Sequence, residues 1–237
     1  EFGIGVGRTA RYVAGHSLGE YSALAAAGSF SVADAARLLQ IRGRAMQRAT
    51  PVGTGAMAAL LGLDYEAAVA IAEEAAQGQV CEAANDNGPG QVVVSGDVRA
   101  VERAVEIARG RGARRAVLLP VSAPFHCALM QPAAEVMTEA LGTVAVKRPS
   151  VPVIANVTAG PLSDPAVIRE ALIAQVTGVV RWRESIGYLG SQGVGLLVEL
   201  GAGRVLTGLS RRMLPEAKCI AASTPDEIVQ AAELLRV

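Results

Sequence analysis

Hydrophobic and polar positions alternate along the chain with two periods, which predict strands and helices in turn. Short apolar runs, as at 195–200, are typical of buried strands, whereas apolar residues three or four apart, as at 98–108, are typical of amphipathic helices. Because the two kinds of segment follow one another, we expect an α/β fold. The predicted helices are 20–27, 32–49, 64–76, 97–111, 131–141, 164–175, one opening at about 204, and 225–236; the predicted strands are 12–14, 56–61, 80–84, 91–95, 114–119, 151–155, 195–200 and 218–222.

The segment 55–120 has an order of its own. It is predicted to run strand, helix, strand, strand, helix, strand, which is the β-α-β-β-α-β order of ferredoxin-like folds. We therefore expect a small ferredoxin-like subdomain at 55–120, inserted into a large hydrolase-like α/β subdomain with a parallel sheet, formed by 1–54 and 121–237. A cleft between the two is a favourable ligand site. The polar run Asn-Asp-Asn-Gly-Pro-Gly at 85–90 is expected to be a hairpin turn.

The motif Gly-His-Ser-Leu-Gly at 15–19 lies between a predicted strand and a predicted helix. Strand, Gly-x-Ser-x-Gly, helix is the context of a nucleophile elbow, in which the glycines allow a sharp turn and close passage of backbone. Ser17 would then lie at a helix N-terminus, where free N–H groups favour the negative charge that develops during acyl transfer. An ordinary tight turn is the alternative interpretation, because the bare motif is common by chance.

A serine nucleophile needs a base, and the chain has two histidines. His16 directly precedes Ser17, and adjacent elbow residues point different ways, so His126 is the candidate general base. His126 lies in a loop after a predicted strand, a frequent place for catalytic residues, although a packed or surface histidine remains the alternative. Gln175, an inward polar residue at a helix C-terminus, fits either a group that orients this base or a simple helix cap.

Arg42 falls inside the apolar stripe of the predicted helix 32–49. A buried guanidinium keeps its charge and therefore needs an anion. No acidic residue lies near Arg42 on that face of the helix. Its partner is therefore either a distant carboxylate or the carboxylate of a ligand, unless the side chain merely buries its stem and keeps its head in water.

Composition excludes several classes of protein. The chain has 237 residues, 51% of them apolar, and its 22 basic and 22 acidic residues balance. This balance, with 3% aromatic residues, argues against a nucleic-acid or anionic-membrane partner, and no apolar run is long enough to span a membrane. The three cysteines are far apart, which argues against disulfides and a metal site and favours the reducing cytoplasm.

With Ser17, Arg42 and His126 placed, the sequence resembles the malonyl-CoA:acyl carrier protein transacylases of bacterial fatty-acid synthesis. The resemblance covers essentially the whole chain and rests on residues 15–24, 41–46, 85–95, 122–130 and 198–209. It implies transfer of a malonyl group from malonyl-CoA to the phosphopantetheine thiol of acyl carrier protein, through a seryl ester in a ping-pong exchange. Malonyl-CoA is a substrate in this reaction, and we expect no cofactor and a monomer.

The same resemblance implies roles for individual residues. Ser17 would carry the malonyl ester, His126 would take its proton and later activate the carrier's thiol, and Arg42 would bind the malonyl carboxylate. Gln175 would hold His126 through its backbone carbonyl, and the Leu18 N–H would be one oxyanion donor. The further candidates for substrate binding are Asn87, His16 and Phe125, the last of which resembles a position in malonyl-selective acyltransferase domains of polyketide synthases.

One feature of the family is missing before Ser17. The family's first strand ends in a Gly-Gln-Gly-x-Gln loop whose glutamine is a second oxyanion donor, and this sequence has no such motif there. We therefore expect that an N-terminal segment is absent, and loss of one oxyanion donor lowers the rate by about a hundred- to a thousandfold. The alternatives are a serine esterase or thioesterase with the same elbow, and an inactive carrier-binding fragment.

Overall fold

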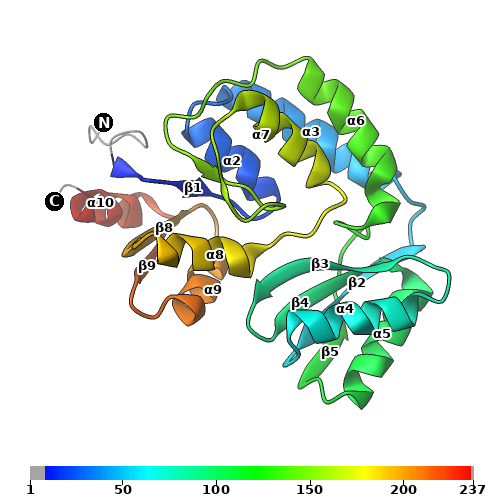
Figure 1. The fold of residues 1–237 in the computed structure, drawn as a ribbon. Coiled ribbons are helices and arrows are strands. Elements are labelled where there is room, and N and C mark those ends of the chain that lie inside the picture. The colour runs from blue at the N-terminus through cyan, green and yellow to red at the C-terminus, as the bar shows by residue number, and fades with distance from the viewer. Residues whose placement is uncertain (1–8, 236–237) are drawn as a thin grey trace.

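The structure is a computed structural model that describes residues 9–235. The first eight residues of the predicted segment 1–54 and the last residue of the predicted helix 225–236 lie outside the described residues. Strands and helices are interleaved as predicted, so the α/β class is confirmed. Figure 1 shows a helical group around the start of the chain, a separate antiparallel sheet with two helices, and a C-terminal group.

The helical group surrounds a small sheet that contains the first strand. The sheet has the order β1 (Val13–Ala14), β6 (Val153–Ile154), β7 (Pro161–Leu162), and β1 pairs with β6 in parallel. Buried residues recur at helical spacing along the surrounding helices and give each of them an apolar face. These faces pack together into the largest core. The helices are α2 (Leu18–Ala26), α3 (Val32–Arg48), α6 (Gln131–Gly142) after the short turn η1 (Ala128–Met130), and α7 (Pro165–Ala174).

The second group is an antiparallel sheet with the strand order β3-β4-β2-β5. Side chains along its strands alternate between two faces. Leu60 and Val94 pack against the helices, whereas Met57 and Val93 lie in a cluster with Phe125 on the other face, which anchors the loop that carries His126. The elements are β2 (Gly55–Leu61), α4 (Tyr65–Ala76), β3 (Cys81–Gly88), β4 (Gln91–Asp97), α5 (Val98–Gly110) and β5 (Arg115–Leu118), in the predicted order.

The C-terminal group contains a helix that the sequence interpretation missed. This helix, α8, buries Trp182, Ile186 and Leu189, a spacing typical of an amphipathic helix, but Gly187 and Gly190 lower its helix propensity. Strands β8 (Leu196–Leu200) and β9 (Lys218–Ala222) pair in parallel and form a separate two-stranded sheet. The elements are α8 (Trp182–Ser191), β8 (Leu196–Leu200), α9 (Val205–Met213), β9 (Lys218–Ala222) and α10 (Pro225–Leu234). The division into subdomains at 55–120 stays a prediction.

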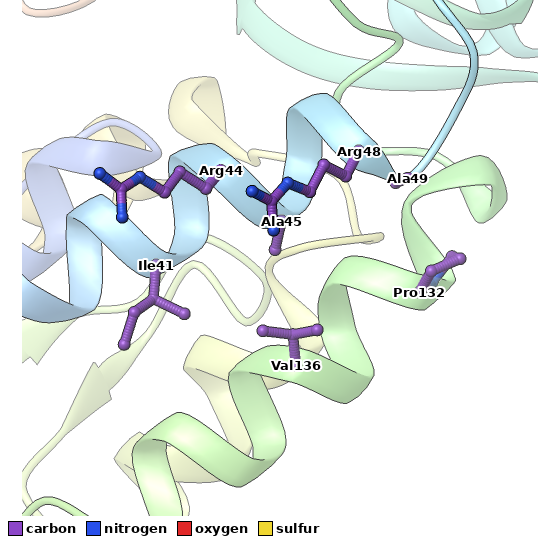
Figure 2. Close-up of a pocket in the computed structure, with 7 residues that line it drawn as sticks. All are labelled: Ile41, Arg44, Ala45, Arg48, Ala49, Pro132 and Val136. Atoms are coloured by element: carbon purple, nitrogen blue, oxygen red, sulfur yellow. The ribbon is translucent and has the colours of Figure 1, made fainter.

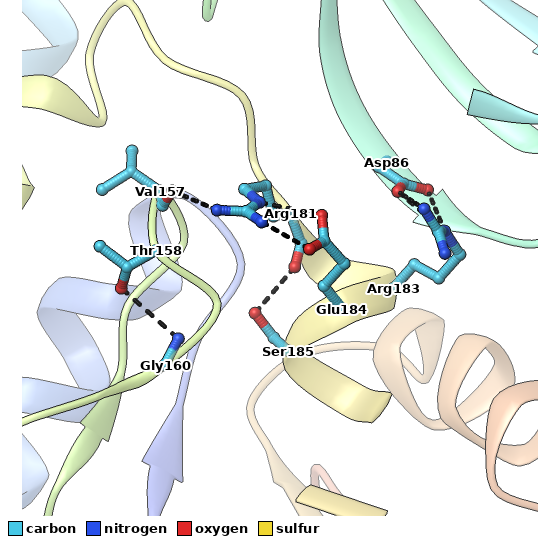
Figure 3. Close-up of polar contacts among 8 residues, drawn as sticks. All are labelled: Asp86, Val157, Thr158, Gly160, Arg181, Arg183, Glu184 and Ser185. Carbon is cyan, nitrogen blue, oxygen red and sulfur yellow. Dashed lines mark hydrogen bonds and ion pairs between the residues drawn. The ribbon is translucent and has the colours of Figure 1, made fainter. Parts of the chain in front are cut away.

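The predicted turn at 85–90 is wrong over most of its length. Residues 85–88 continue strand β3, with register shifts on either side of Asn85 and Asp86. Asp86 is 1% exposed, yet its backbone N–H bonds to the Val180 carbonyl at 2.9 Å and its carboxylate pairs with Arg183 at 2.8 Å (Figure 3). Partners distant in sequence satisfy these polar groups, so a run typical of a turn is stable as a buried strand.

Candidate active site

Ser17 occupies a strained turn between strand β1 and helix α2. Its φ is 52° and its ψ is −107°, values that side-chain-bearing residues rarely adopt. A Cβ on Gly15 would lie 2.0 Å from the Gly19 carbonyl carbon, so this position requires glycine, whereas a Cβ on Gly19 would meet nothing within 4 Å. Close backbone approach, expected for both glycines of the motif, is therefore found at Gly15 alone.

The Ser17 hydroxyl oxygen lies 2.7 Å from His126 Nε2. The other ring nitrogen, Nδ1, lies 2.9 Å from the Gln175 carbonyl and 3.2 Å from the Gly178 carbonyl. Carbonyl oxygens only accept, so Nδ1 must carry the hydrogen, and in the neutral ring Nε2 is then free to accept from the Ser17 hydroxyl. His126 is thus held in the tautomer that a general base requires, by carbonyls in place of an acid.

The Arg42 guanidinium reaches the same hydroxyl from helix α3. Its Nη2 donates to Ser17 Oγ at 3.0 Å and to Gln175 Oε1 at 2.9 Å, and the residue is 6% exposed. Its Nε is buried without a hydrogen-bond partner among the described residues. No carboxylate in residues 9–235 forms an ion pair with Arg42. The guanidinium therefore keeps donors free for an anion beside the nucleophile.

The other predicted site residues lie around this centre. Leu18 follows Ser17 as the first residue of α2, and its N–H has no acceptor among residues 9–235, as an oxyanion donor requires. His16 Nε2 donates to Asn87 Oδ1 at 2.7 Å, which links the elbow to strand β3. Phe125 precedes His126 and contacts two apolar clusters. The structure thus brings all eight predicted residues to one region.

One hollow of the surface is lined by a predicted site residue, and a larger one is not. A small one is lined by Asn87 and its neighbours in the β3–β4 hairpin and by Leu209 and Met213 of α9, so it lies where the antiparallel sheet meets the C-terminal group. A larger groove of about 280 Å³ lies between α3 and α6, with Ile41 and Val136 facing each other across it (Figure 2). The larger groove contains none of the predicted site residues, so volume alone does not locate the chemistry.

Comparison with known proteins identifies the family of the chain. Residues 4–222 match the acyl transferase domain family. The chain belongs to the acyl transferase family. It is 46% identical to the malonyl CoA-acyl carrier protein transacylase of Escherichia coli K12 over 96% of this chain and 74% of that protein. It is also 46% identical to the Bacillus subtilis 168 protein of the same name, over 97% of this chain and 73% of that protein. The predicted family resemblance is confirmed.

Solved structures of similar proteins have the same fold. The acyl-carrier-protein-S-malonyltransferase of Bartonella henselae superposes with a TM-score of 0.96 at 56% identity, over 99% of this chain and 75% of that one. A malonyl-transacylase solved in complex with its type II PKS acyl-carrier protein superposes with a TM-score of 0.92 at 44% identity, over 94% of this chain and 72% of that one. The fold of this acyl transferase is therefore that of the transacylases.

Electrostatics in this acyl transferase keep the base neutral. Burial, and then the positive charge of Arg42, lower the pKa of His126 from 6.5 to about 3. Burial also lowers the pKa of His16, and the hydrogen bond that the ring donates to Asn87 opposes this shift. Both rings are consequently uncharged near neutral pH, and His126 Nε2 is available to accept a proton.

Sequence reasoning missed two buried polar residues of the site. Asn156 Oδ1 accepts from the Ser17 N–H at 2.7 Å, and its Nδ2 donates to the Gly15 carbonyl at 2.7 Å, so it bridges the two ends of the segment 15–17. Glu20, 1% exposed, accepts from the Asn156 backbone N–H at 3.1 Å and from Gln175 Nε2 at 2.8 Å. A usable signal was present for Asn156, because it is a polar residue just beyond the apolar strand predicted at 151–155.

Two kinds of feature are absent from residues 9–235. That part of the chain holds no cluster of His, Cys, Asp or Glu suited to a metal ion. Within the same residues no helix has the length and apolar character to cross a membrane. The expectation that no cofactor is used stays a prediction.

Proposed function

We propose that this chain transfers a malonyl group from malonyl-CoA to the thiol of an acyl carrier protein, with Ser17 carrying the group between them. The observation that carries this proposal is the placement of Arg42, whose buried guanidinium donates to the Ser17 hydroxyl at 3.0 Å and pairs with no carboxylate of the described residues. A second carboxylate on the substrate is the anion that such a guanidinium lacks. The transacylases at 46% identity support this choice of substrate.

The first half-reaction acylates Ser17. Its hydroxyl oxygen attacks the thioester carbonyl while His126 Nε2, 2.7 Å away, takes the hydroxyl proton. The Gln175 and Gly178 carbonyls accept from Nδ1 and stabilise the imidazolium that forms. The Leu18 N–H donates to the oxyanion. The carbon–sulfur bond then breaks, and the departing coenzyme A sulfur takes the proton from His126.

The second half-reaction runs the same steps with the carrier's thiol as nucleophile. The thiol gives its proton to His126 Nε2, and its sulfur attacks the carbonyl of the seryl ester. The bond from the carbonyl carbon to Ser17 Oγ breaks, and the serine oxygen recovers the proton from His126. Because one histidine serves both directions, the exchange is reversible and follows ping-pong kinetics.

Selectivity for malonyl over acetyl groups comes from Arg42 in this proposal. A malonyl carboxylate binds the free donors of the guanidinium, whereas an acetyl group leaves them buried and unpaired, which costs binding free energy. His16 and Asn87 hold the elbow against β3, and Phe125 forms part of the apolar wall beside His126. An esterase would need no such buried cation, so the esterase alternative is not favoured.

The remaining properties are proposed from the composition of the sequence. Balanced charge supports the absence of a nucleic-acid or membrane partner, and three separate, buried, free cysteines support a cytoplasmic location. We propose a monomer that uses no cofactor. The alternative of an inactive carrier-binding fragment predicts binding of the carrier without any covalent adduct on Ser17.

Intact mass spectrometry tests the function. The protein is mixed with malonyl-CoA, and separately with acetyl-CoA, and then with holo-acyl carrier protein. We expect a malonyl-sized gain that is absent in Ser17→Ala and that the holo-carrier discharges. Release of the group to water at the same rate without carrier would support the esterase, and no gain at all would overturn the proposal.

A further inference from the structure

Glu20 is a buried carboxylate that the transfer mechanism does not use. It lies three residues after the nucleophile, so Ser17-Leu18-Gly19-Glu20 has the Ser-x-x-Glu spacing of a helix capping box. The structure does not form that box. Ser17 makes no side-chain cap, and its N–H is taken by Asn156 Oδ1. The Glu20 carboxylate is therefore free to make other contacts.

Those contacts are with the residue that touches both His126 and Arg42. Glu20 Oε2 accepts from Gln175 Nε2 at 2.8 Å, while Gln175 Oε1 accepts from Arg42 Nη2 at 2.9 Å. A carboxylate of Glu20 and the guanidinium of Arg42 thus lie on opposite ends of one amide. The second Nε2 hydrogen reaches the Ser17 carbonyl at 3.0 Å, so every hydrogen of the amide has an acceptor.

This arrangement fixes which end of the amide faces the guanidinium. Guanidinium groups only donate, so the amide oxygen must face Arg42 and the amide nitrogen must face an acceptor. The Glu20 carboxyl is the strongest of the three acceptors on the nitrogen side, because charged hydrogen bonds are stronger than neutral ones; the others are the Ser17 carbonyl and Asn156 Oδ1. Without it, the backbone N–H of Asn156 would be buried without an acceptor, and Gln175 Nε2 would keep only the Ser17 carbonyl at 3.0 Å and Asn156 Oδ1 at 3.4 Å.

The amide also separates two opposite charges. Arg42 and Glu20 are close enough for each to shift the pKa of the other, yet no ion pair forms between them in the described residues. A direct pair would occupy the donors of Arg42 and compete with the carboxylate of the substrate. With Gln175 between them, Arg42 gives one donor to the amide oxygen, and its Nε stays without a partner.

We propose that Glu20 is a positioning residue that sets selectivity for malonyl groups: it fixes the Gln175 amide with its oxygen toward Arg42, and so holds the guanidinium where the malonyl carboxylate binds. The inference rests on the proposed malonyl transfer. Glu20 acts as an acceptor and does not touch the substrate. Glutamine retains that acceptor, so Glu20→Gln preserves the effect, and Glu20→Met, which has similar length and no acceptor, abolishes it.

The test is a competition between equimolar malonyl-CoA and acetyl-CoA. Intact mass spectrometry at an early reaction time gives the ratio of malonyl to acetyl adduct on Ser17. The unaltered protein is measured first, and absence of a malonyl adduct there refutes the proposed function, not the role of Glu20. Given an adduct, we expect the ratio to fall about tenfold in Glu20→Met, in the range of one charged hydrogen bond. We expect it to stay within about threefold in Glu20→Gln.

Glu199→Met is the matched control. Its carboxylate also accepts two N–H groups, those of Leu206 at 3.1 Å and Thr207 at 2.7 Å, but it caps α9 away from Arg42. We expect this variant to lose stability and keep its malonyl-to-acetyl ratio. An unchanged ratio in folded Glu20→Met overturns the proposal. Where Glu20→Met does not fold, a tenfold fall in folded Glu20→Gln overturns it, because that variant keeps the acceptor.

Discussion

Ser17 and His126 face each other across 2.7 Å, and both hold left-handed backbone conformations, with φ of 52° and 61°. Such conformations are costly for residues with side chains and persist where the surrounding structure imposes them. Asn156 supports the conformation at Ser17 by accepting from the Ser17 N–H and donating to the Gly15 carbonyl. The strain thus lies at the two residues that the proposed chemistry uses.

Replacement of the nucleophile gives the simplest prediction. Ser17→Ala removes the oxygen that receives the malonyl group, so we expect no covalent adduct and a loss of transfer of about a thousandfold or more. Ser22→Ala, an exposed serine on the same helix, is the control and should acylate normally. Intact mass after malonyl-CoA treatment reads both, and a persistent adduct in Ser17→Ala would place the nucleophile elsewhere.

Removal of the guanidinium tests the source of selectivity. In Arg42→Ala we expect kcat/KM for malonyl-CoA to fall about 10- to 100-fold, as for loss of a charged hydrogen bond, with little change for acetyl-CoA. Arg44 lies on the same helix with its side chain exposed. As a control, Arg44→Ala should therefore leave kcat/KM for both substrates unchanged. Equal losses for the two substrates in Arg42→Ala would contradict the assigned role.

The two glycines of the elbow should respond oppositely to alanine. A Cβ at Gly15 would meet backbone atoms of Gly19 at 2.0 Å, which no side-chain rotation relieves, so Gly15→Ala should destabilise the fold by about 3 kcal/mol. At Gly19 the space is open and the residue is helical, so Gly19→Ala should be neutral or stabilise by up to about 1 kcal/mol. Urea unfolding of both variants measures the difference.

The pH dependence of stability follows from His126. Its folded pKa of about 3 lies below its usual value of 6.5, so between these values the unfolded chain binds a proton that the folded chain does not. This group therefore lowers stability as pH falls from about 6.5 toward 3. In His126→Gln that dependence should be lost, so the variant gains stability relative to the unaltered protein on acidification. Parallel urea titrations at pH 7.5 and pH 5 check the sign.

Glu20 should make stability depend on pH in the opposite direction. Burial raises its pKa from 4.5 to about 7, against the hydrogen bonds from Gln175 and Asn156 and the charge of Arg42. Between pH 4.5 and 7 the folded chain holds a proton that the unfolded chain has lost, so this group lowers stability as pH rises. Glu20→Gln should therefore gain stability relative to the unaltered protein across this interval. Identical pH profiles for the two proteins would refute the shift.

Local patterns were sufficient for most elements and for the individual site residues. Helix α3, for example, begins after Ser31, whose hydroxyl accepts from the Asp34 N–H at 3.0 Å, as is typical of a serine N-cap. The inward position of Arg42 followed from helical spacing and is also confirmed by its 6% exposure. The prediction of a turn at 85–90 was wrong because a distant partner overrides the local preference. Asp86 pairs with Arg183, which stabilises this polar run as part of a strand.

The sequence by itself determined the order of elements, the elbow around Ser17 and the family, because periodicity, caps and motifs act over a few neighbouring residues. Tertiary structure decided which groups meet. Ser17 and His126 are 109 positions apart, and Ser17 and Asn156 are 139 apart. The tautomer of His126 and the link from Glu20 through Gln175 to Arg42 exist only in the packed core, where burial favours hydrogen bonds between polar groups whatever their separation along the chain.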